Sequence, residues 1–278
     1  GEVTAEVLWV DRIGVVPASG VKVMNAEKRD KAYISVETEN QSGNAVIAMK
    51  VNGKIYWSWH IWCTDYDPNL EEGQQEFNGY TWMDRNLGAT YNWLYTEPEE
   101  ELYSVTGEIK PITKISVSTS DINNIPGSVN NPMAYYTAPS QLLWFSYSTK
   151  YPYLWNTKSG KKTIFDPCPD GWRVPAGKDG ISTPWEDSGL EQVFYEERYG
   201  GGFAGRSDIY YPATGYRYGG TGELSGSLGQ VVMLRAGNLG RDMKCRNMCL
   251  YWTERIHGKG ESVIWDEATA GAVRCVKE

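Results

Sequence analysis

The sequence predicts an α+β fold made mostly of short β-strands, with long loops and few short helices. Short apolar runs recur along the chain, and clusters of Gly, Pro, Asn and Asp separate them as turns do. The best pattern for an amphipathic helix occupies one short segment. Strand and helix patterns do not alternate as they do in βαβ units, so a parallel sheet is not expected.

Residues 1–66 are predicted to form a β-strand-rich region packed on the main domain. Strands are expected at residues 5–10, 21–24, 32–38, 45–51 and 54–62. Asn52-Gly53 is typical of a two-residue hairpin turn between the last two strands. Residues 54–62 are apolar on both faces, which predicts a central strand covered on two sides, with His60 as a satisfied core residue. A strand of this kind needs cover, so residues 1–66 are not expected to fold alone.

Residues 67–278 are predicted to form the main domain, with an insertion at about 92–136. The insertion is polar, carries the acidic segment Glu97-Pro98-Glu99 and is rich in Ser and Thr, while residues such as Ile109 and Ile115 would supply one or two strands. Long excursions are often binding loops, so the insertion is a candidate part of a binding face.

A helix is predicted at 183–195. Thr183 would cap it, Pro184 suits its first turn, and Leu190, Val193 and Phe194 form an apolar stripe. Glycine-rich turns follow this segment, and strands are expected between them at 209–213, 231–234, 250–253, 262–265 and 271–276.

A disulfide between Cys168 and Cys275 is the preferred pairing in this sequence. Pro167, Pro169 and Gly171 predict a turn that delivers a short strand after Cys168, and Cys275 lies in a predicted closing strand. If the two thiols pair, the chain-entropy model assigns the bond roughly 4 to 5 kcal/mol of stabilisation. Such a bond requires an oxidising compartment.

The five cysteines leave at least one thiol unpaired if all disulfides are internal. Cys245 and Cys249 would either close a second, small disulfide loop or remain two buried thiols, and Cys63 is interpreted as a small buried hydrophobe. Two thiolates without further ligands are too few for tetrahedral zinc, and neither His60 nor His257 has a metal-binding spacing. No metal and no cofactor are therefore expected.

The composition excludes several classes of function. A net charge of −8 and an isoelectric point near 5.0 argue against nucleic-acid binding, which needs clustered Lys and Arg. No run of 18 apolar residues predicts a transmembrane helix. The chain is expected to be mature or trimmed, with any export signal or lipid anchor removed. Its 12 Trp and 19 Tyr against 5 Phe favour half-wet surfaces, since Trp and Tyr combine an apolar body with a polar tip.

Five segments, in order, resemble the Fibrobacter succinogenes major paralogous domain family, and the resemblance spans roughly residues 55–278. The segments are Tyr80-Thr81-Trp82-Met83-Asp84-Arg85-Asn86-Leu87-Gly88-Ala89, Cys168-Pro169-Asp170-Gly171-Trp172-Arg173-Val174-Pro175, Pro212-Ala213-Thr214-Gly215-Tyr216-Arg217, Tyr251-Trp252-Thr253 and Val273-Arg274-Cys275-Val276. The resemblance implies an exported protein with a fold similar to C-type lectins and formylglycine-generating enzymes. It also supports the pairing of Cys168 with Cys275.

The N-terminal region resembles the segment that precedes this domain in Bacteroides members, some of which occur with fimbrial proteins. This implies an extracellular location, at the cell surface or anchored to the outer membrane. The chain departs from the family after Trp252, where Thr253-Glu254-Arg255 replaces the usual Ser-Ser-Thr. The insertion and the Cys245/Cys249 pair also look peculiar to this chain, so a ligand shared by the family does not transfer to it.

The residues favour binding over catalysis. Phosphate and dinucleotide loops are missing, and Glu97-Pro98-Glu99 imitates the calcium-binding motif of C-type lectins only superficially. Aromatic faces with polar neighbours can hold a glycan without metal. The candidate ligand residues are Tyr210, Tyr211, Tyr216, Arg217, Tyr218 and Trp252.

The sequence therefore predicts a non-enzymatic surface module for binding or adhesion, such as a fimbrial tip or accessory subunit that recognises a glycan or a host or bacterial surface protein. One alternative is a structural subunit of a surface assembly with no glycan ligand. Another is a thiol-oxidising enzyme of the formylglycine-generating type, which would need reactive paired thiols, with Cys245 and Cys249 as the candidates.

Overall fold

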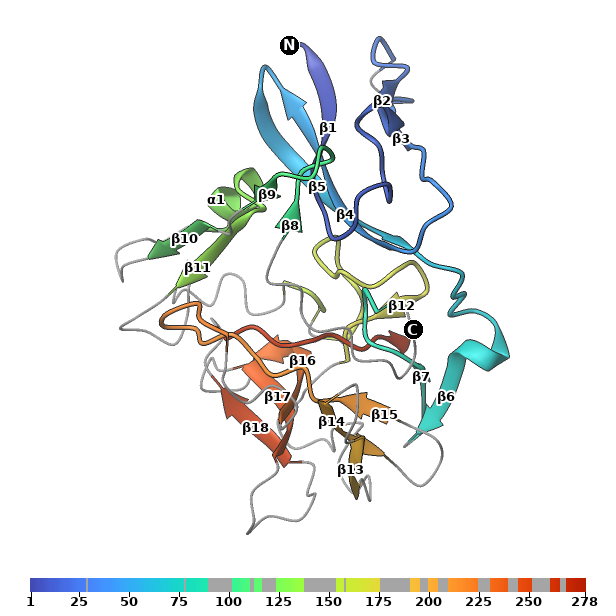
Figure 1. Ribbon diagram of the computed structural model, residues 1–278, viewed down its shortest axis with the longest axis vertical. Helices are drawn as coiled ribbons and strands as arrows, with labels where there is room; N and C mark the ends of the chain where they lie inside the picture. The colour runs from blue at the N-terminus through green and yellow to red at the C-terminus, as the bar shows by residue number, and fades with distance from the viewer. Residues whose placement is uncertain are drawn as a thin grey trace. The chain divides into compact units, whose positions relative to one another are not determined.

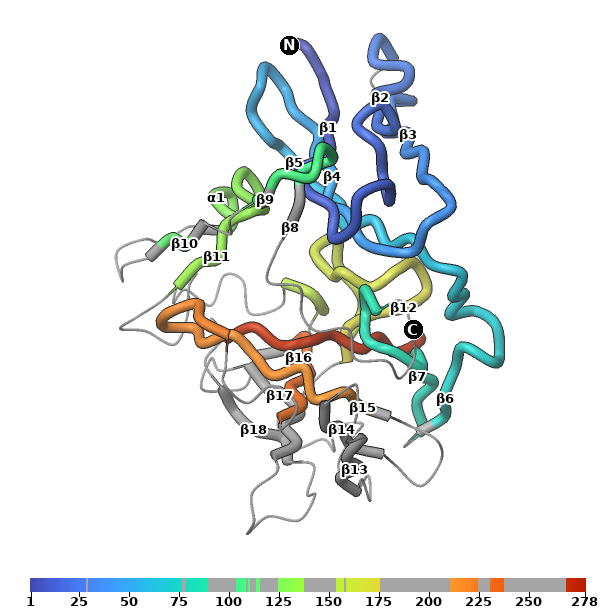
Figure 2. Tube along the Cα trace, in the orientation of Figure 1, coloured from blue at the N-terminus to red at the C-terminus, as the bar shows by residue number. Residues whose placement is uncertain are grey.

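The computed structural model describes residues 1–28, 30–77, 79–89, 102–110, 113–116, 124–137, 154–157, 159–175, 191–195, 200–204, 210–224, 231–239, 245–251, 261–265 and 269–278. These residues form a mostly β structure of several small antiparallel sheets, with one α-helix (Figure 1). The chain divides into two compact units, whose segments can be followed by colour in Figure 2. The first unit comprises 1–66, 99–115 and 123–135, and the second comprises 67–98, 116–122 and 136–278.

The first unit contains a five-stranded sheet with the order β5-β4-β1-β8-β9. Its strands are β1 (Val3–Val10), β4 (Gly43–Val51), β5 (Lys54–Cys63), β8 (Leu102–Tyr103) and β9 (Ile109–Lys110). A second hairpin pairs β2 (Val21–Met24) with β3 (Tyr33–Val36) after a 3-10 turn at Ala18–Gly20. The strands predicted within residues 1–66 are thus confirmed, with small shifts at their ends.

The turn between β4 and β5 has the predicted form. Asn52 and Gly53 have φ angles of 51° and 78°, the left-handed conformation that a two-residue type I′ hairpin requires. Buried residues beneath the sheet form a core of Val10, Val15, Val16, Val21, Ala45 and Ile47. The partly buried Ile61 and Cys63 of β5 pack against this core.

The predicted central position of β5 is wrong. Among the described residues β5 pairs only with β4 and lies at the edge of the sheet. A register shift after Met49 leaves Tyr56 with no partner on β4, and the side chains of Tyr56 and Trp59 are 52% and 38% exposed. The apolar residues on both faces of this segment correctly indicated a strand. They do not specify which other strands pair with it, so its position in the sheet could not be predicted from them.

Part of the predicted insertion belongs to the first unit. Tyr103 of β8 pairs with Val10 of β1, and β9 pairs with β8, so these strands extend the N-terminal sheet. The helix α1 (Asn124–Asn130) packs against β5. The strands β10 (Thr113–Ser116) and β11 (Ala134–Thr137) pair with each other. The insertion therefore supplies regular structure, more than the one or two strands predicted.

The second unit is built around a four-stranded sheet with the order β12-β19-β7-β6. Its strands are β6 (Gln74–Phe77), which follows a 3-10 turn at Glu71–Gly73, β7 (Tyr80–Met83), β12 (Trp172–Arg173) and β19 (Val276–Lys277). The core of this unit consists of Trp82, Tyr211, Ala213, Val232, Leu234, Ala236 and Val276. The middle of the chain and its end thus pair side by side within one sheet.

Two further sheets of three strands belong to the second unit. One contains β13 (Glu191–Tyr195), β14 (Gly200–Ala204) and β15 (Tyr210–Pro212), and the other contains β16 (Val231–Leu239), β17 (Cys245–Tyr251) and β18 (Glu261–Trp265). Strands were predicted at β15, β16 and β18, whereas the strand predicted at 250–253 overlaps β17 only at its last two residues, and no strand was predicted at β13 or β14. The strand predicted at 271–276 is regular only in β19.

The helix predicted at 183–195 is wrong over its last five residues. Glu191–Tyr195 is β13, and Val193 and Phe194 pair with Gly202 and Gly201 of β14. Residues 183–190 lie outside the described part of the chain. The local apolar pattern favoured a helix, whereas pairing with the glycine-rich strand overrides that weak preference.

Candidate functional site

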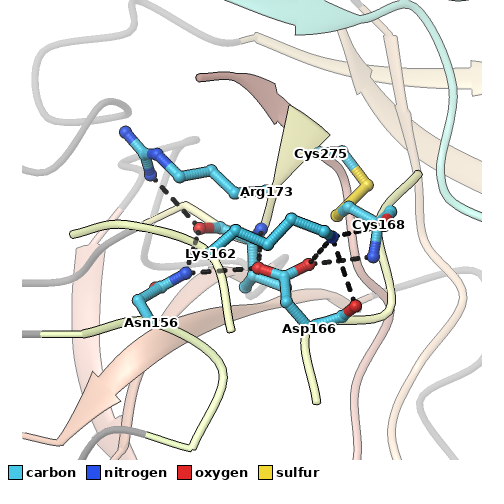
Figure 3. Close-up of a disulfide and its surroundings, with 7 residues drawn as sticks. Asn156, Lys162, Asp166, Cys168, Arg173 and Cys275 are labelled. Carbon is cyan, nitrogen blue, oxygen red and sulfur yellow. Dashed lines mark hydrogen bonds and ion pairs between the residues drawn. A yellow bond between two sulfur atoms is a disulfide. The ribbon is translucent and has the colours of Figure 1, made fainter. Parts of the chain in front are cut away.

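A disulfide joins Cys168 to Cys275 within the second unit, as predicted (Figure 3). The two residues are 107 apart in sequence and their Cα atoms are 6.0 Å apart. Both are buried, and the carbonyl of Cys275 accepts a hydrogen bond of 3.0 Å from the main-chain N–H of Met83. The bond therefore ties the segment before β12 to the strand that pairs with β7.

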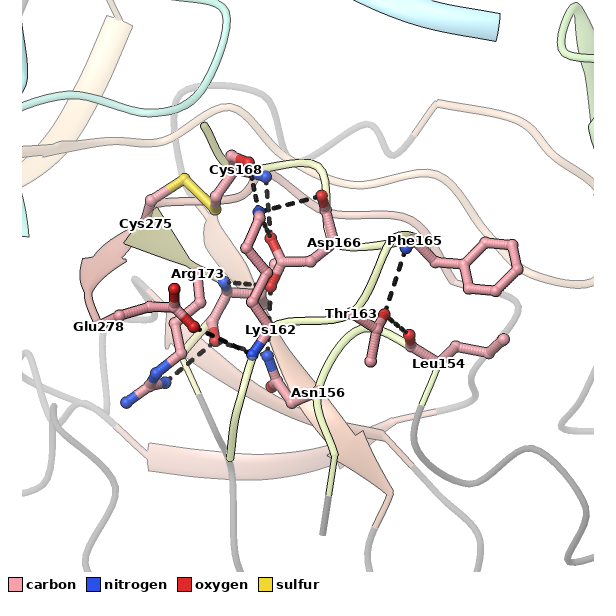
Figure 4. Close-up of polar contacts among 11 residues, drawn as sticks. Leu154, Asn156, Lys162, Thr163, Phe165, Asp166, Cys168, Arg173, Cys275 and Glu278 are labelled. Carbon is pink, nitrogen blue, oxygen red and sulfur yellow. Dashed lines mark hydrogen bonds and ion pairs between the residues drawn. A yellow bond between two sulfur atoms is a disulfide. The ribbon is translucent and has the colours of Figure 1, made fainter. Parts of the chain in front are cut away.

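A buried carboxylate organises the turn that carries Cys168. Asp166 accepts hydrogen bonds from the main-chain N–H groups of Cys168 and Val174, both at 2.9 Å, and from the Asn156 amide at 3.2 Å. The Lys162 ammonium lies 3.0 Å from the same carboxylate and also donates to the carbonyl of Cys168 (Figure 4). Four donors engage Asp166, whose side chain is fully buried, so the carboxylate holds the turn in place. Asp166, Lys162, Asn156 and the disulfide are called the Cys168 staple below.

A second buried charge lies behind the sheet of the second unit. Arg274 is 0% exposed, its Nε donates to Asn86 at 3.1 Å, and its guanidinium lies 4.2 Å from the centre of the Tyr211 ring. Burial raises the pKa of Tyr211 above its usual value, and the nearby Arg274 opposes the rise, so the phenol is neutral. Tyr211 is 1% exposed. The expectation that Tyr211 contacts a ligand is corrected, because its ring is enclosed in the core.

The remaining candidates divide between surface and interior. Tyr216 is 8% exposed, whereas Tyr218 is 44% exposed. Arg217 is half-buried, and its guanidinium donates to the carbonyl of Gly222 at 3.1 Å. The side chain of Tyr210 and the whole of Trp252 lie outside the described residues. Of these three neighbouring candidates, Tyr218 is therefore exposed, Arg217 is half-buried and Tyr216 is buried.

Residues 216–224, here called the Tyr218 hairpin, are fixed by main-chain hydrogen bonds. Arg217 forms antiparallel bridges with both Leu224 and Ala270. Its N–H donates to the Ala270 carbonyl at 2.9 Å, and its carbonyl accepts from the Ala270 N–H at 3.1 Å. The base of the hairpin is therefore held on two sides by the body of the second unit.

The tip of the Tyr218 hairpin is also closed. The N–H of Tyr218 donates to the carbonyl of Glu223 at 2.9 Å, and the N–H of Gly222 donates to the carbonyl of Tyr218 at 2.7 Å. Gly222 has a φ of 69°, a conformation that favours glycine. The rings of Tyr216 and Tyr218 meet edge to face with their centres 5.1 Å apart. An exposed aromatic ring is thereby presented on a pre-organised turn.

The two cysteines considered for a second disulfide lie in β17, and their side chains are outside the described part of the chain. Cys245 and Cys249 lie four positions apart in one extended strand, which pairs with β16 and β18. A strand rises about 3.3 Å per residue, so their Cα atoms are about 13 Å apart, beyond the roughly 7 Å that a disulfide tolerates. Cys63 is a half-buried free thiol, and burial, aided by the charge of Asp11, raises its pKa above the usual value for a thiol.

The polar cluster around His60 lies at the surface of the first unit. His60 Nε2 is 2.8 Å from Asn44 Oδ1, and the amide of Asn44 donates to Asp11 at 2.6 Å. The ring is exposed to solvent, so the predicted core position is corrected, although the predicted hydrogen-bond partner is present. Desolvation by the surrounding chain still lowers the pKa of His60 from its usual value, and the Asp11 charge opposes this shift. Within the described residues, no group of three or more His, Cys, Asp or Glu side chains could hold a metal ion.

The sequence patterns did not predict a role for Asp166 or Glu223, although the residues around Asp166 are typical of a turn that its side chain would stabilise. Asp166 precedes Pro167 and Cys168, and its carboxylate accepts from the N–H two residues later, as in an Asx turn. Glu223 lies opposite Tyr218 in the hairpin, and this position could be recognised only once the pairing of the two hairpin strands was known.

No helix in the described part of the chain is long and apolar enough to cross a membrane. Comparison of the chain with protein-family models, curated proteins and solved structures found no match.

Proposed function

We propose that the chain is a non-enzymatic binding module of an exported cell-surface protein and that it recognises a glycan through the Tyr218 hairpin. The single observation that carries this proposal is the exposed ring of Tyr218 on a turn closed by hydrogen bonds at its tip and its base. The disulfide is compatible with a location outside the cytoplasm, where such bonds persist. A fimbrial tip or accessory subunit is the setting that the sequence resemblance implies.

The geometry suits binding for an energetic reason. Tyrosine offers a large, rigid contact area that loses few rotamers on binding, and a turn that is already ordered avoids the cost of ordering a loop. The buried ring of Tyr216 contacts the Tyr218 ring edge to face, which restricts the rotamers open to Tyr218. The buried carboxylate of Asp166 is already fully engaged by four donors, so it offers no comparable ligand-binding surface.

A glycan array probed with the full oxidised chain tests this function. We expect binding to a subset of glycans, and we expect Tyr218→Ala to abolish it while the protein stays folded. The matched control is Tyr33→Ala, because Tyr33 is 55% exposed but lies on β3 of the first unit. Silence of the folded wild-type chain across the array would remove the proposal, and equal loss in both variants would remove the assignment to the hairpin.

A second candidate function, a subunit of a surface assembly, is favoured by a separate feature. Ile164 and Phe165 are 77% and 37% exposed at the tip of a loop next to the Cys168 staple. The hydroxyl of Thr163 donates to the carbonyl of Leu154 and accepts from the N–H of Phe165, so the tip is fixed (Figure 4). Figure 4 shows the Phe165 ring pointing away from the polar contacts. Large exposed apolar side chains on a rigid support are typical anchors of protein interfaces.

The two candidate functions are separated by a capture experiment on outer-membrane extracts. If the chain is an assembly subunit, it should retain a partner in a one-to-one ratio, and the double variant Ile164→Ser/Phe165→Ser should lose that partner. Ile13→Ser is the control, because Ile13 is 56% exposed in the first unit. Capture that is insensitive to the double variant would exclude the Ile164–Phe165 tip as the anchor.

A further inference from the structure

The register of the Tyr218 hairpin places a carboxylate beside the exposed ring. Arg217 and Leu224 are direct partners, and the N–H of Tyr218 donates to the carbonyl of Glu223, so Tyr218 and Glu223 occupy the next pair of positions. Residues directly opposite in an antiparallel pair project from the same face, with Cβ atoms about 5 Å apart. Both residues are exposed. An aromatic face and an acceptor-only group therefore stand together at the surface.

The basic residue of the Tyr218 hairpin holds the turn and is not on the face that carries Tyr218 and Glu223. Arg217 is the only Lys or Arg in residues 216–224, and its guanidinium donates to the carbonyl of Gly222. Arg217 precedes Tyr218 in the strand, so its side chain projects from the opposite face of the hairpin. The exposed face thus presents Tyr218 and Glu223 without a cation from the hairpin itself.

We infer that the Tyr218 hairpin selects uncharged hexopyranose residues and rejects acidic ones such as sialic or uronic acids. The inference rests on the proposed function. A pyranose ring exposes a face of C–H groups that covers an aromatic side chain, and its hydroxyls are donors that the carboxylate of Glu223 can accept. An acidic sugar would bring a second negative charge to Glu223, on a chain whose net charge is already −8.

Thr221 adds a second polar group to the same turn. Its hydroxyl oxygen accepts the N–H of Glu223 at 3.2 Å, which leaves the hydroxyl proton for a sugar oxygen. One aromatic face and two polar groups make a small contact, so a single sugar residue is expected to bind with a dissociation constant of about 1 mM. Tighter binding would require several copies of the chain on one surface.

Saturation-transfer NMR with the full oxidised chain and four probes tests the inference. The neutral probes are the methyl β-pyranosides of galactose and glucose, and the acidic probes are sialic acid and glucuronic acid. We expect at least one neutral probe to bind and both acidic probes to bind at least tenfold more weakly. Tyr218→Ala should weaken neutral binding at least tenfold, whereas Tyr218→Phe should retain most of it because the ring remains.

Glu223→Gln tests the charge of Glu223 itself. If Glu223 had only a structural role, this substitution would not change the relative affinities for acidic and neutral sugars. Removing the charge should raise the affinity for glucuronic acid relative to the neutral probes by several fold. Asp170→Asn is the matched control, since Asp170 is an exposed acid elsewhere in the second unit, and it should leave this ratio unchanged. Tighter binding of an acidic probe would overturn the inference and leave the proposed function intact. Failure of every probe and every array glycan with folded protein would overturn both.

Discussion

The Cys168 staple and the Tyr218 hairpin use similar residue types for opposite purposes. In the staple, charged groups point inward and are fully satisfied, with Asp166 held by four donors beside a buried disulfide. In the hairpin, hydrogen bonds are made by the main chain and the aromatic ring of Tyr218 points outward. The comparison shows that the most distinctive motif of the sequence forms a buried, fully engaged support, whereas the surface proposed for binding is an ordinary glycine-rich turn.

Loss of the disulfide is expected to have the largest effect. Replacing Cys168 and Cys275 by Ser should lower the free energy of unfolding by about 4 kcal/mol, because the bond closes a loop of 107 residues in the unfolded chain. Denaturant unfolding of the oxidised proteins measures this difference. Cys63→Ser is the control for removal of a thiol and should change stability by about 1 kcal/mol or less. A small change in the double variant would mean that the staple does not depend on its covalent bond.

Removal of the central carboxylate should have the next largest effect. Asp166→Ala removes the buried carboxylate that pairs with the Lys162 ammonium, and it leaves two main-chain N–H groups without their acceptor, so we expect a loss of about 3 kcal/mol. The exposed Asp170, four residues away, provides the control, and Asp170→Ala should change stability by less than about 0.5 kcal/mol. Equal effects of the two substitutions in thermal unfolding would contradict the assigned role of Asp166.

The fit of Asn156 against β16 gives a third prediction. A Cβ atom on Gly237 would lie 1.8 Å from Oδ1 of Asn156, which is itself 0% exposed, so Gly237→Ala must displace this donor to Asp166. We expect a loss of about 2 kcal/mol from overpacking. The double variant Gly237→Ala/Asn156→Ala should then lose less than the sum of the two single variants, because the second substitution removes the clash. Strict additivity would show that Gly237 acts elsewhere.

The smallest effect on stability is expected in the hairpin. Tyr218→Ala removes an edge-to-face contact with Tyr216 from a side chain that is 44% exposed, so the cost should be about 1 kcal/mol or less. Its effect on glycan binding should nevertheless be larger than that of any staple variant that remains folded. A loss of stability comparable to that of Asp166→Ala would place Tyr218 in the supporting frame instead of the binding surface.

Local patterns in the sequence predicted local structure well. The strand Val21–Met24 was predicted with its observed bounds, and Asn52-Gly53 forms the expected hairpin turn because its conformation depends only on neighbouring residues. The pairing of Cys168 with Cys275 was also predicted, from a turn and a closing strand at distant points of the chain. The strand and the hairpin turn depend on residue type more than on tertiary surroundings.

Features that depend on distant neighbours were not predictable in the same way. The edge position of β5 is set by which strands pair with it, and β13 forms because the glycine-rich β14 lies beside it. Tyr211 and Tyr218 are only seven residues apart in sequence, yet Arg274 lies over the ring of Tyr211, whereas the ring of Tyr218 is exposed to solvent. Burial of an aromatic side chain is a property of the fold, so the candidate site could be narrowed only once the structure was known.

The most direct measurement is saturation-transfer NMR with methyl β-galactopyranoside and methyl β-glucopyranoside on the oxidised wild-type chain and Tyr218→Ala, with thermal unfolding recorded on the same samples. The structure predicts that the variant loses the sugar signal while its melting temperature falls by no more than about 4 °C. Retention of the full signal by the folded variant would contradict the central claim that the Tyr218 hairpin is the binding surface.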